Sequence, residues 1–368
     1  MKMKPLFNME LSDISSDFFL RNDKYESLLS KYAVKSKNSR RKQKESQTNF
    51  YRNPFQVDRD RIIHTNSFRR LKHKSQVFVA PQGDHYTTRL THVIEVSQIG
   101  RTIARALNLN EDLVEAASLG HDLGHTPFGH IGESVLDKIL DQGFHHSRHS
   151  VKIIEMIEKN GKGLNLTDSV IEAIKRHSKV QGEFLTEESI LGMSLEAQIV
   201  RISDALAYLS HDIEDAKRSG FIDLKQIPEN IDIFFNIPRS ERINIFVSDV
   251  VINSWNCTGN NQIKKAPFIK MSNNLSKSLT ILRNYMFENF YLPVSDSKQG
   301  KAASKIIEVL FDYYLSNFEK IPNKKYLLNQ DKNITVADFI CGMTDLYAIK
   351  ESEEIFSGIS KDLKFKNI

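Results

Sequence analysis

Histidines are concentrated in the middle of this 368-residue chain, because all 12 of them lie between residues 64 and 211. Three of them form one dense run with two carboxylates: His121, Asp122, His125, His130 and Glu133. A single histidine on an apolar helix face is more often a hydrogen-bonded core residue, but imidazole nitrogens interleaved with carboxylate oxygens are a typical metal donor set. The run therefore predicts a divalent-ion site, and Mg, Mn, Fe, Ni, Co and Zn all remain open.

A second group of polar residues follows about 80 residues later in the chain. Asp204, Tyr208 and Asp212 are spaced four residues apart, so on one helix they lie on a single face. An aromatic ring one helical turn from a metal ligand can pack against a sugar. The alternative interpretation is a core tyrosine beside a solvated aspartate, and the spacing alone leaves both open.

Several helices are expected to position these side chains. Over residues 89–107 apolar residues recur at three- and four-residue steps, which predicts an amphipathic helix with His92 on its buried face. Asn110 fits the N-cap of a helix that runs toward His121, and Gly124 and Pro127 then bend the chain. Further helices are predicted at 24–32, 58–70, 128–140, 151–159, 168–176, 195–216, 277–290 and 302–315.

The fold class predicted from these elements is mainly α. One small β-hairpin is expected, with a strand at 76–79 and a turn at 80–84. Residues 217–275 lack a regular period and predict long loops or an accessory lobe. We therefore expect a basic, loosely held N-terminal arm at 1–50, a helical-bundle core at 51–216, and a mostly helical C-terminal region at 217–368.

Charge is distributed unevenly along the chain, although the formal net charge is only +5. Residues 1–75 hold 18 Lys and Arg against 8 Asp and Glu, and the densest basic segment is 35–44. This arm could contact phosphates or single-stranded nucleic acid, or it could be a solvated, mobile segment. Because no apolar stretch is long enough to cross a bilayer and no signal-peptide pattern is present, we expect a cytoplasmic protein without membrane contact.

The order of the candidate ligands resembles the signature of the HD superfamily. A lone helical histidine, a His-Asp doublet and a later aspartate match at His92, His121, Asp122 and Asp204. The flanking segments DRDRIIH (58–64), TRLTH (88–92) and GHDLGHTPFGHIGE (120–133) are similar to the deoxyguanosinetriphosphate triphosphohydrolase-like family, and the similarity covers about residues 40–216.

This resemblance implies an HD-domain helical bundle and a role for each matched position. The four signature residues would hold a divalent ion, and His130 and Glu133 would act in catalysis. The positions implied in substrate binding are Gln76, Val77, Arg89, His125, His146, Tyr208 and Asp212. The implied reaction converts deoxynucleoside triphosphates, either dGTP or several of them, into deoxynucleoside and inorganic triphosphate. A homo-oligomer is also implied.

The sequence departs from the family at residues 146–150, where HSRHS replaces the usual His-Asn-x-Gln-Ser. From about residue 217 onward no motif can be aligned, so base preference cannot be read from the sequence. Two alternatives remain open. One is another HD-type nucleotide phosphohydrolase or phosphodiesterase, and the other is a regulatory nucleotide- or nucleic-acid-binding module that uses the arm around Arg40 and Arg41.

Overall fold

The computed structural model describes residues 11–45, 51–77, 86–178, 186–261, 265–322 and 331–363, which are almost entirely helical. The expected mainly α class is confirmed. Within these ranges the only β pairing is two isolated bridges, Arg41 with Thr167 and Ser75 with Thr88. The expected hairpin is therefore not seen: the chain turns into helices on both sides of the second bridge, and residues 78–84 lie outside the described ranges.

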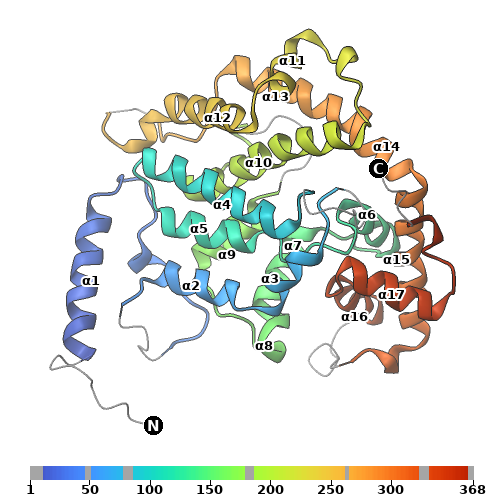
Figure 1. Cartoon of the computed structure of the whole chain (residues 1–368). Helices are drawn as coiled ribbons and strands as arrows, with labels where there is room; N and C mark the ends of the chain where they lie inside the picture. The colour runs from blue at the N-terminus through green and yellow to red at the C-terminus, as the bar shows by residue number, and fades with distance from the viewer. Residues whose placement is uncertain are drawn as a thin grey trace.

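The centre of the molecule is a bundle of long helices (Figure 1). Helices α4 (Arg89–Ala106), α5 (Glu111–Gly120) and α10 (Leu195–Ser219) pack on one another, with α2 (Pro54–Ile63) and α9 (Asp168–Arg176) against α5. The apolar positions that predicted α4 are buried, and Asn110 caps α5 by accepting the amide of Leu113. The expected boundary at residue 216 lies inside α10.

The segment 217–275, for which long loops or an accessory lobe were expected, contains two further helices, so the long-loop alternative was wrong. They are α11 (Glu229–Asn236) and α12 (Arg239–Asn253). The fully buried Arg242 ties α12 to α10, since its Nη1 donates to the Ser210 carbonyl at 2.7 Å and its Nη2 donates to Glu214 at 2.8 Å. Helix α13 (Asn273–Met286) and a π-helical turn (Phe287–Tyr291) extend the same apolar core.

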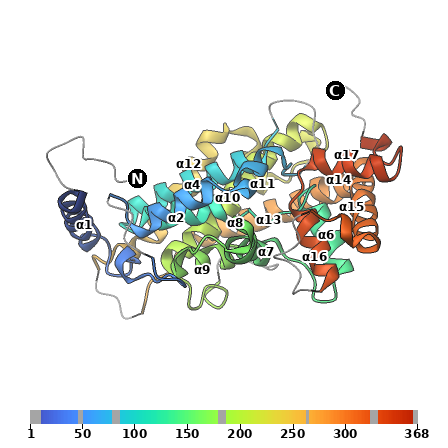
Figure 2. The same ribbon diagram turned by 90° about the horizontal axis from the view of Figure 1, so that it is seen from below.

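A second apolar core lies beside the bundle. It is formed mainly by α15 (Lys298–Ser316), α16 (Lys332–Cys341) and α17 (Asp345–Ile355), which together we call the C-terminal lobe. The short α14 (Leu292–Asp296) leads into it. Helix α6 (His130–Ile139) packs against α15 and contributes Ile131, Val135 and Leu136 to this second core. Figures 1 and 2 both show α6 among the helices of the lobe.

Several predicted boundaries differ from the structure. The helix expected at 58–70 is divided into α2 and α3 (Asn66–Arg70), because Thr65 caps the start of α3. The helix expected at 151–159 is α7 (His146–Lys152), which runs into a π-helical turn (Ile153–Ile157). None of the described helices is both long and apolar enough to cross a membrane.

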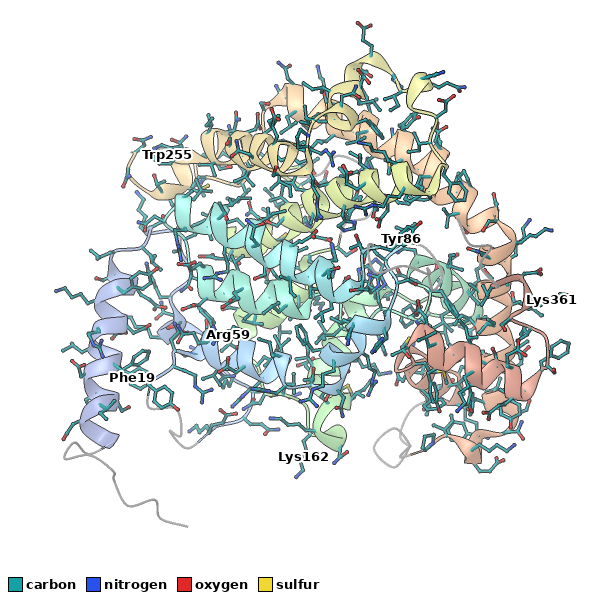
Figure 3. The ribbon with its side chains drawn as sticks, viewed as in Figure 1. Phe19, Arg59, Tyr86, Lys162, Trp255 and Lys361 are labelled. Carbon is teal, nitrogen blue, oxygen red and sulfur yellow. The ribbon has the colours of Figure 1, made fainter. Side chains whose placement is uncertain are left out.

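The N-terminal arm is more ordered than expected. It contains α1 (Leu11–Ser27), a much longer helix than the one predicted at 24–32. The following basic segment is also anchored, because Arg41 pairs at 2.5 Å with the fully buried Asp58, and Lys35 donates to the Glu26 carbonyl at 2.6 Å. A loosely held arm is therefore wrong for residues 11–45. Figure 3 shows Phe19 of α1 and Lys361 of the C-terminal end at opposite edges of the molecule.

Candidate metal centre and phosphate site

The four predicted metal ligands converge from three helices. His92 is near the start of α4, His121 and Asp122 follow α5, and Asp204 projects from α10. The Nε2 atom of His92 lies 3.1 Å from Asp204 Oδ1, and the Nε2 atom of His121 lies 3.7 Å from the same oxygen. His121 Nε2 is also 3.4 Å from Asp122 Oδ1. These side chains form a compact group of two nitrogen and two carboxylate donors.

The hydrogen bonding of His121 supports an ion at this place. Its Nδ1 lies 2.6 Å from the Ser118 carbonyl, which can only accept, so the proton of a neutral His121 is on Nδ1 and Nε2 then carries a lone pair. His121 is fully buried, and Nε2 has no hydrogen-bond partner among the described residues. An unsatisfied buried polar atom costs about 1–3 kcal/mol. A divalent ion would use this lone pair, so the residues fit a metal.

Both aspartates are held in their ionised form. Burial raises the pKa of Asp122, but His121, His125 and Arg89 oppose it and lower the pKa well below its ordinary value. Burial likewise opposes ionisation of Asp204, and His121 and His92 again lower its pKa well below the usual range. Both carboxylates are therefore available as anionic ligands.

A chain of polar contacts begins at the Nδ1 atom of His92, on the opposite side of the ring from Asp204. Its Nδ1 lies 3.1 Å from His211 Nε2, and His211 Nδ1 lies 2.7 Å from Asp212 Oδ1. Tyr291, at the end of the π-helical turn, donates its hydroxyl to Asp212 Oδ2 at 2.6 Å. If His92 Nε2 faces the ion, Nδ1 must carry the proton and His211 Nε2 must accept it, which places the proton of His211 beside Asp212. This order fixes the ring orientation and tautomer of His92.

We expect His211→Leu to weaken metal binding by about 10- to 100-fold, since partners of this kind typically contribute that much to metal affinity. The substitution leaves the buried N–H of His92 without its acceptor. Competition with a fluorescent chelator measures the dissociation constant without any turnover assay. In His211→Gln the amide oxygen can again accept, so affinity should be partly restored. Equal affinity in His211→Leu and the parent protein would contradict the orienting role.

Arg89 is the candidate phosphate ligand whose placement is most specific. It is 1 % exposed and donates from Nη1 to Asp122 Oδ2 at 2.7 Å, while its Nε and Nη2 have no partner within the described ranges. Gly129 permits the close approach of the chain here: its φ is +57°, and a Cβ would lie 2.8 Å from Arg89 Nη2 and 2.9 Å from the Gln76 carbonyl. Two buried guanidinium nitrogens thus remain available to an anion.

Glu133 links two of the predicted catalytic and substrate-binding histidines. Its carboxylate lies 3.0 Å from His130 Nδ1 and 2.8 Å from His146 Nδ1. Burial opposes ionisation of Glu133, but His146 and His130 lower its pKa far below the ordinary value. His125 stacks on His146 with ring centroids 4.0 Å apart, and its Nε2 is 3.3 Å from Asp122 Oδ1. The side chain of His130 is 71 % exposed, so it can meet a substrate from solvent.

Four further residues were predicted to bind substrate: Gln76, Val77, Tyr208 and Asp212. Gln76 is buried, and its side-chain oxygen has no partner in the described part of the chain. Val77 and Tyr208 are partly buried against the first core. Asp212 is 2 % exposed and faces His211 and Tyr291, so its expected place beside a sugar hydroxyl stays a prediction.

Sequence reasoning missed the contacts from the C-terminal lobe to residues 121–129, which we call the His125 loop. Asp345 at the start of α17 accepts the Phe128 amide at 3.0 Å and the Ser75 amide at 2.9 Å. Phe128 has a φ of +61°, a conformation that costs a residue with a side chain about 1–3 kcal/mol. The acceptor from the lobe therefore holds this strained residue two positions before His130.

Two further contacts join the lobe to the same loop. Lys74, whose pKa burial lowers to about 8, donates from Nζ to the carbonyls of His125 at 2.5 Å and Cys341 at 2.6 Å. The Nδ1 atom of His149 lies 3.1 Å from the Gly124 carbonyl oxygen, and its Nε2 atom lies 3.1 Å from Asp338 Oδ1. The histidines of the His125 loop and the GMTD segment at 342–345 can both be read in the sequence. Nothing in their spacing predicts that the two segments lie in contact.

The sequence of this chain is similar to those of known proteins. Residues 89–209 match the family model of the HD domain, and residues 269–354 match that of the phosphohydrolase-associated domain. The chain is 45 % identical over 331 residues to a deoxyguanosinetriphosphate triphosphohydrolase-like protein of Caldanaerobacter subterraneus, and the match covers 89 % of this chain and 92 % of that one. Proteins with the same description match from Desulfatibacillum aliphaticivorans (40 % identity, 89 % and 94 % covered) and Bartonella tribocorum (37 %, 88 % and 94 %).

Proposed function

Because this chain belongs to the deoxyguanosinetriphosphate triphosphohydrolase-like family of metal-dependent HD phosphohydrolases, we propose that it hydrolyses deoxynucleoside triphosphates to deoxynucleoside and inorganic triphosphate. The observation that carries the proposal is Arg89, which is buried beside the metal donors and whose Nε and Nη2 have no partner among the residues that the structure describes. A guanidinium in this position suits a polyphosphate, since its planar N–H groups bind phosphate oxygens in pairs.

The proposed ion site consists of His92, His121, Asp122 and Asp204. When bound, a divalent ion supplies positive charge at a phosphate oxygen and lowers the pKa of a water molecule. Arg89 would hold the phosphate chain and restrict it to one orientation. His125 and His146, whose rings stack on each other, would contact further phosphate oxygens, as the family resemblance implies.

Cleavage at the α-phosphorus creates a leaving 5′-oxygen that is a poor leaving group without a proton. His130 would donate that proton from its Nε2 atom, because its Nδ1 faces Glu133 at 3.0 Å. Glu133 would stabilise the protonated ring and fix its orientation. The ring of Tyr208, one turn after Asp204, would pack against the deoxyribose and exclude a 2′-hydroxyl by steric fit.

The reaction is tested with metal-reconstituted protein and each of the four deoxynucleoside triphosphates, singly and mixed. Liquid chromatography would identify the nucleosides, and ion chromatography the phosphates. Equimolar deoxynucleoside and triphosphate are expected. Monophosphate with pyrophosphate would instead assign the chain to another branch of HD phosphohydrolases. Absence of turnover with every metal and mixture, together with strongly salt-dependent DNA binding, would favour a regulatory binding module.

Two expectations about partners belong to the same proposal. We expect a homo-oligomer in the cytoplasm, on the strength of the family resemblance. We also expect any contact with single-stranded nucleic acid to use exposed basic residues of the arm, such as Lys37, Arg40, Lys42 and Lys44, because Arg41 is engaged with Asp58. Equilibrium sedimentation with and without an oligonucleotide addresses both.

A further inference from the structure

Lys74 is a buried cation to which the proposed reaction assigns no role. It is 2 % exposed, and burial lowers its pKa to about 8, so the charged form is costly to keep at this position. Its ammonium has three donors, and two of them meet main-chain carbonyls, those of His125 at 2.5 Å and Cys341 at 2.6 Å. One side chain therefore joins the His125 loop to the C-terminal lobe.

The main chain of Lys74 holds a second residue of the candidate phosphate site. Its carbonyl accepts the amide of Arg89 at 3.1 Å, next to the isolated bridge between Ser75 and Thr88. Arg89 begins α4, and its guanidinium is the candidate phosphate ligand. Lys74 thus contacts Arg89 through its carbonyl and His125 through its ammonium, and so it fixes the spacing between these two residues.

The ring of His125 depends on the main chain for its position. It stacks on the ring of His146 with centroids 4.0 Å apart, and its Nε2 lies 3.3 Å from Asp122 Oδ1. Its Nδ1 has no hydrogen-bond partner within the described ranges. The amide of His125 donates to the Asp122 carbonyl at 3.2 Å, and Lys74 holds the carbonyl of the same residue. A displacement of about 1 Å in such a group can cost about 100-fold in rate.

We propose that Lys74 is a positioning residue for the phosphate site: its ammonium holds the His125 carbonyl at a fixed distance from Arg89, with the Cys341 carbonyl of the C-terminal lobe as the opposite anchor. The inference rests on the proposed function, because it concerns how His125 and Arg89 bind a polyphosphate. Lys74 acts through the main chain of His125 and does not itself bind phosphate. Since His125 would hold the phosphate chain in the substrate and in the transition state alike, loss of the ammonium should raise KM and change kcat little.

The test measures binding of inorganic triphosphate to the Mn²⁺-loaded protein by calorimetry at pH 7, with Mn²⁺ in excess so that triphosphate does not strip the ion. Lys74→Met keeps the length of the side chain and the carbonyl that accepts from Arg89. In this variant we expect the dissociation constant of triphosphate to rise about 10- to 100-fold. KM for the deoxynucleoside triphosphate should rise by the same factor. Competition with a chelator should give the wild-type affinity for Mn²⁺, which also reports that the variant is folded.

Arg70→Met is the matched control. Arg70 also donates to the C-terminal lobe, from Nη1 to the carbonyl of Gly342 at 2.9 Å, and its substitution removes the same charge. Within the described ranges this hydrogen bond leads to the lobe and not to the His125 loop, so the affinity for triphosphate should be unchanged. Lys74→Gln keeps N–H donors and should lose less affinity than Lys74→Met, and it decides the question if Lys74→Met does not fold.

The outcomes separate positioning of His125 from attachment of the lobe. Wild-type affinity for triphosphate in the Lys74 variants would overturn the proposal. An equal loss in Lys74→Met and Arg70→Met would also overturn it, because weaker attachment of the lobe would then explain both. Formation of monophosphate and pyrophosphate by a wild-type protein that binds triphosphate would contradict the proposed function and leave this comparison unaffected.

Discussion

Asp204→Asn should lower kcat by roughly 1,000-fold or more, which corresponds to about 4 kcal/mol of transition-state stabilisation. The substitution keeps the shape of the side chain but removes the anionic ligand that lies 3.1 Å from His92 Nε2 and 3.7 Å from His121 Nε2. Without this charge the ion would bind weakly, and the two imidazoles would lose their common partner. Initial rates of triphosphate release, measured over a range of metal concentrations, provide the readout.

Asp215→Asn is the matched control for this experiment. Asp215 is on the same helix and is more deeply buried, since its side chain is 3 % exposed against 23 % for that of Asp204, and its carboxylate contacts Arg218 and the Thr87 amide instead of the candidate ligands. It should retain most of the activity and the metal content. Full turnover by a folded Asp204→Asn protein would exclude Asp204 as a ligand of the catalytic ion.

His130→Gln should lower kcat by about 100- to 10,000-fold, the range typical for loss of a general acid. Because the side chain is 71 % exposed and begins α6, its replacement should change the free energy of unfolding by no more than about 0.5 kcal/mol. Metal content should also be unchanged, since His130 is not among the proposed ligands. A defect in kcat without a defect in folding or metal binding would isolate the proton-transfer role.

Changing the leaving group of the substrate tests whether His130 acts as a proton donor. A substrate analogue that releases a nitrophenolate needs no proton from the enzyme, so His130→Gln should hydrolyse it nearly as fast as the parent protein does. His64→Gln, at an exposed histidine that ends α2, serves as the control and should not affect either substrate. An equal loss with both substrates would indicate that His130 serves binding and not protonation of the leaving oxygen.

Local structure was the part of this fold that the sequence could predict. The apolar period of α4, the cap at Asn110 and the run 204–212 on one helix all depend on neighbours within a few residues. The predictions failed where apolar residues do not mark the buried face of a helix. Helix α12 buries Arg242, Phe246 and Val250 at four-residue steps, but one of these three is charged, and the apolar Ile245 and Ile252 are exposed.

In the candidate site too, some residues could be predicted from the sequence and others could not. The ligand set came from the resemblance carried by the His-Asp doublet and its flanking segments, and the structure brings its members together. The contacts of Tyr291 with Asp212 and of Asp345 with Phe128 join residues 79 and 217 positions apart. A single hydrogen bond between such distant residues produces no periodic pattern in the sequence, and polar residues of the same types occur throughout the chain. These partners could be found only once the fold was known.

The contacts between the C-terminal lobe and the His125 loop also bear on how this chain could be shortened or regulated. A fragment ending after α10 would retain all four candidate ligands of the ion, yet it would lack Asp345, Cys341, Asp338 and Tyr291. We therefore expect metal binding and turnover to require different lengths of the chain. We also expect a ligand that moved α16 and α17 to displace Phe128, and with it the proposed proton donor His130, without contacting metal or nucleotide.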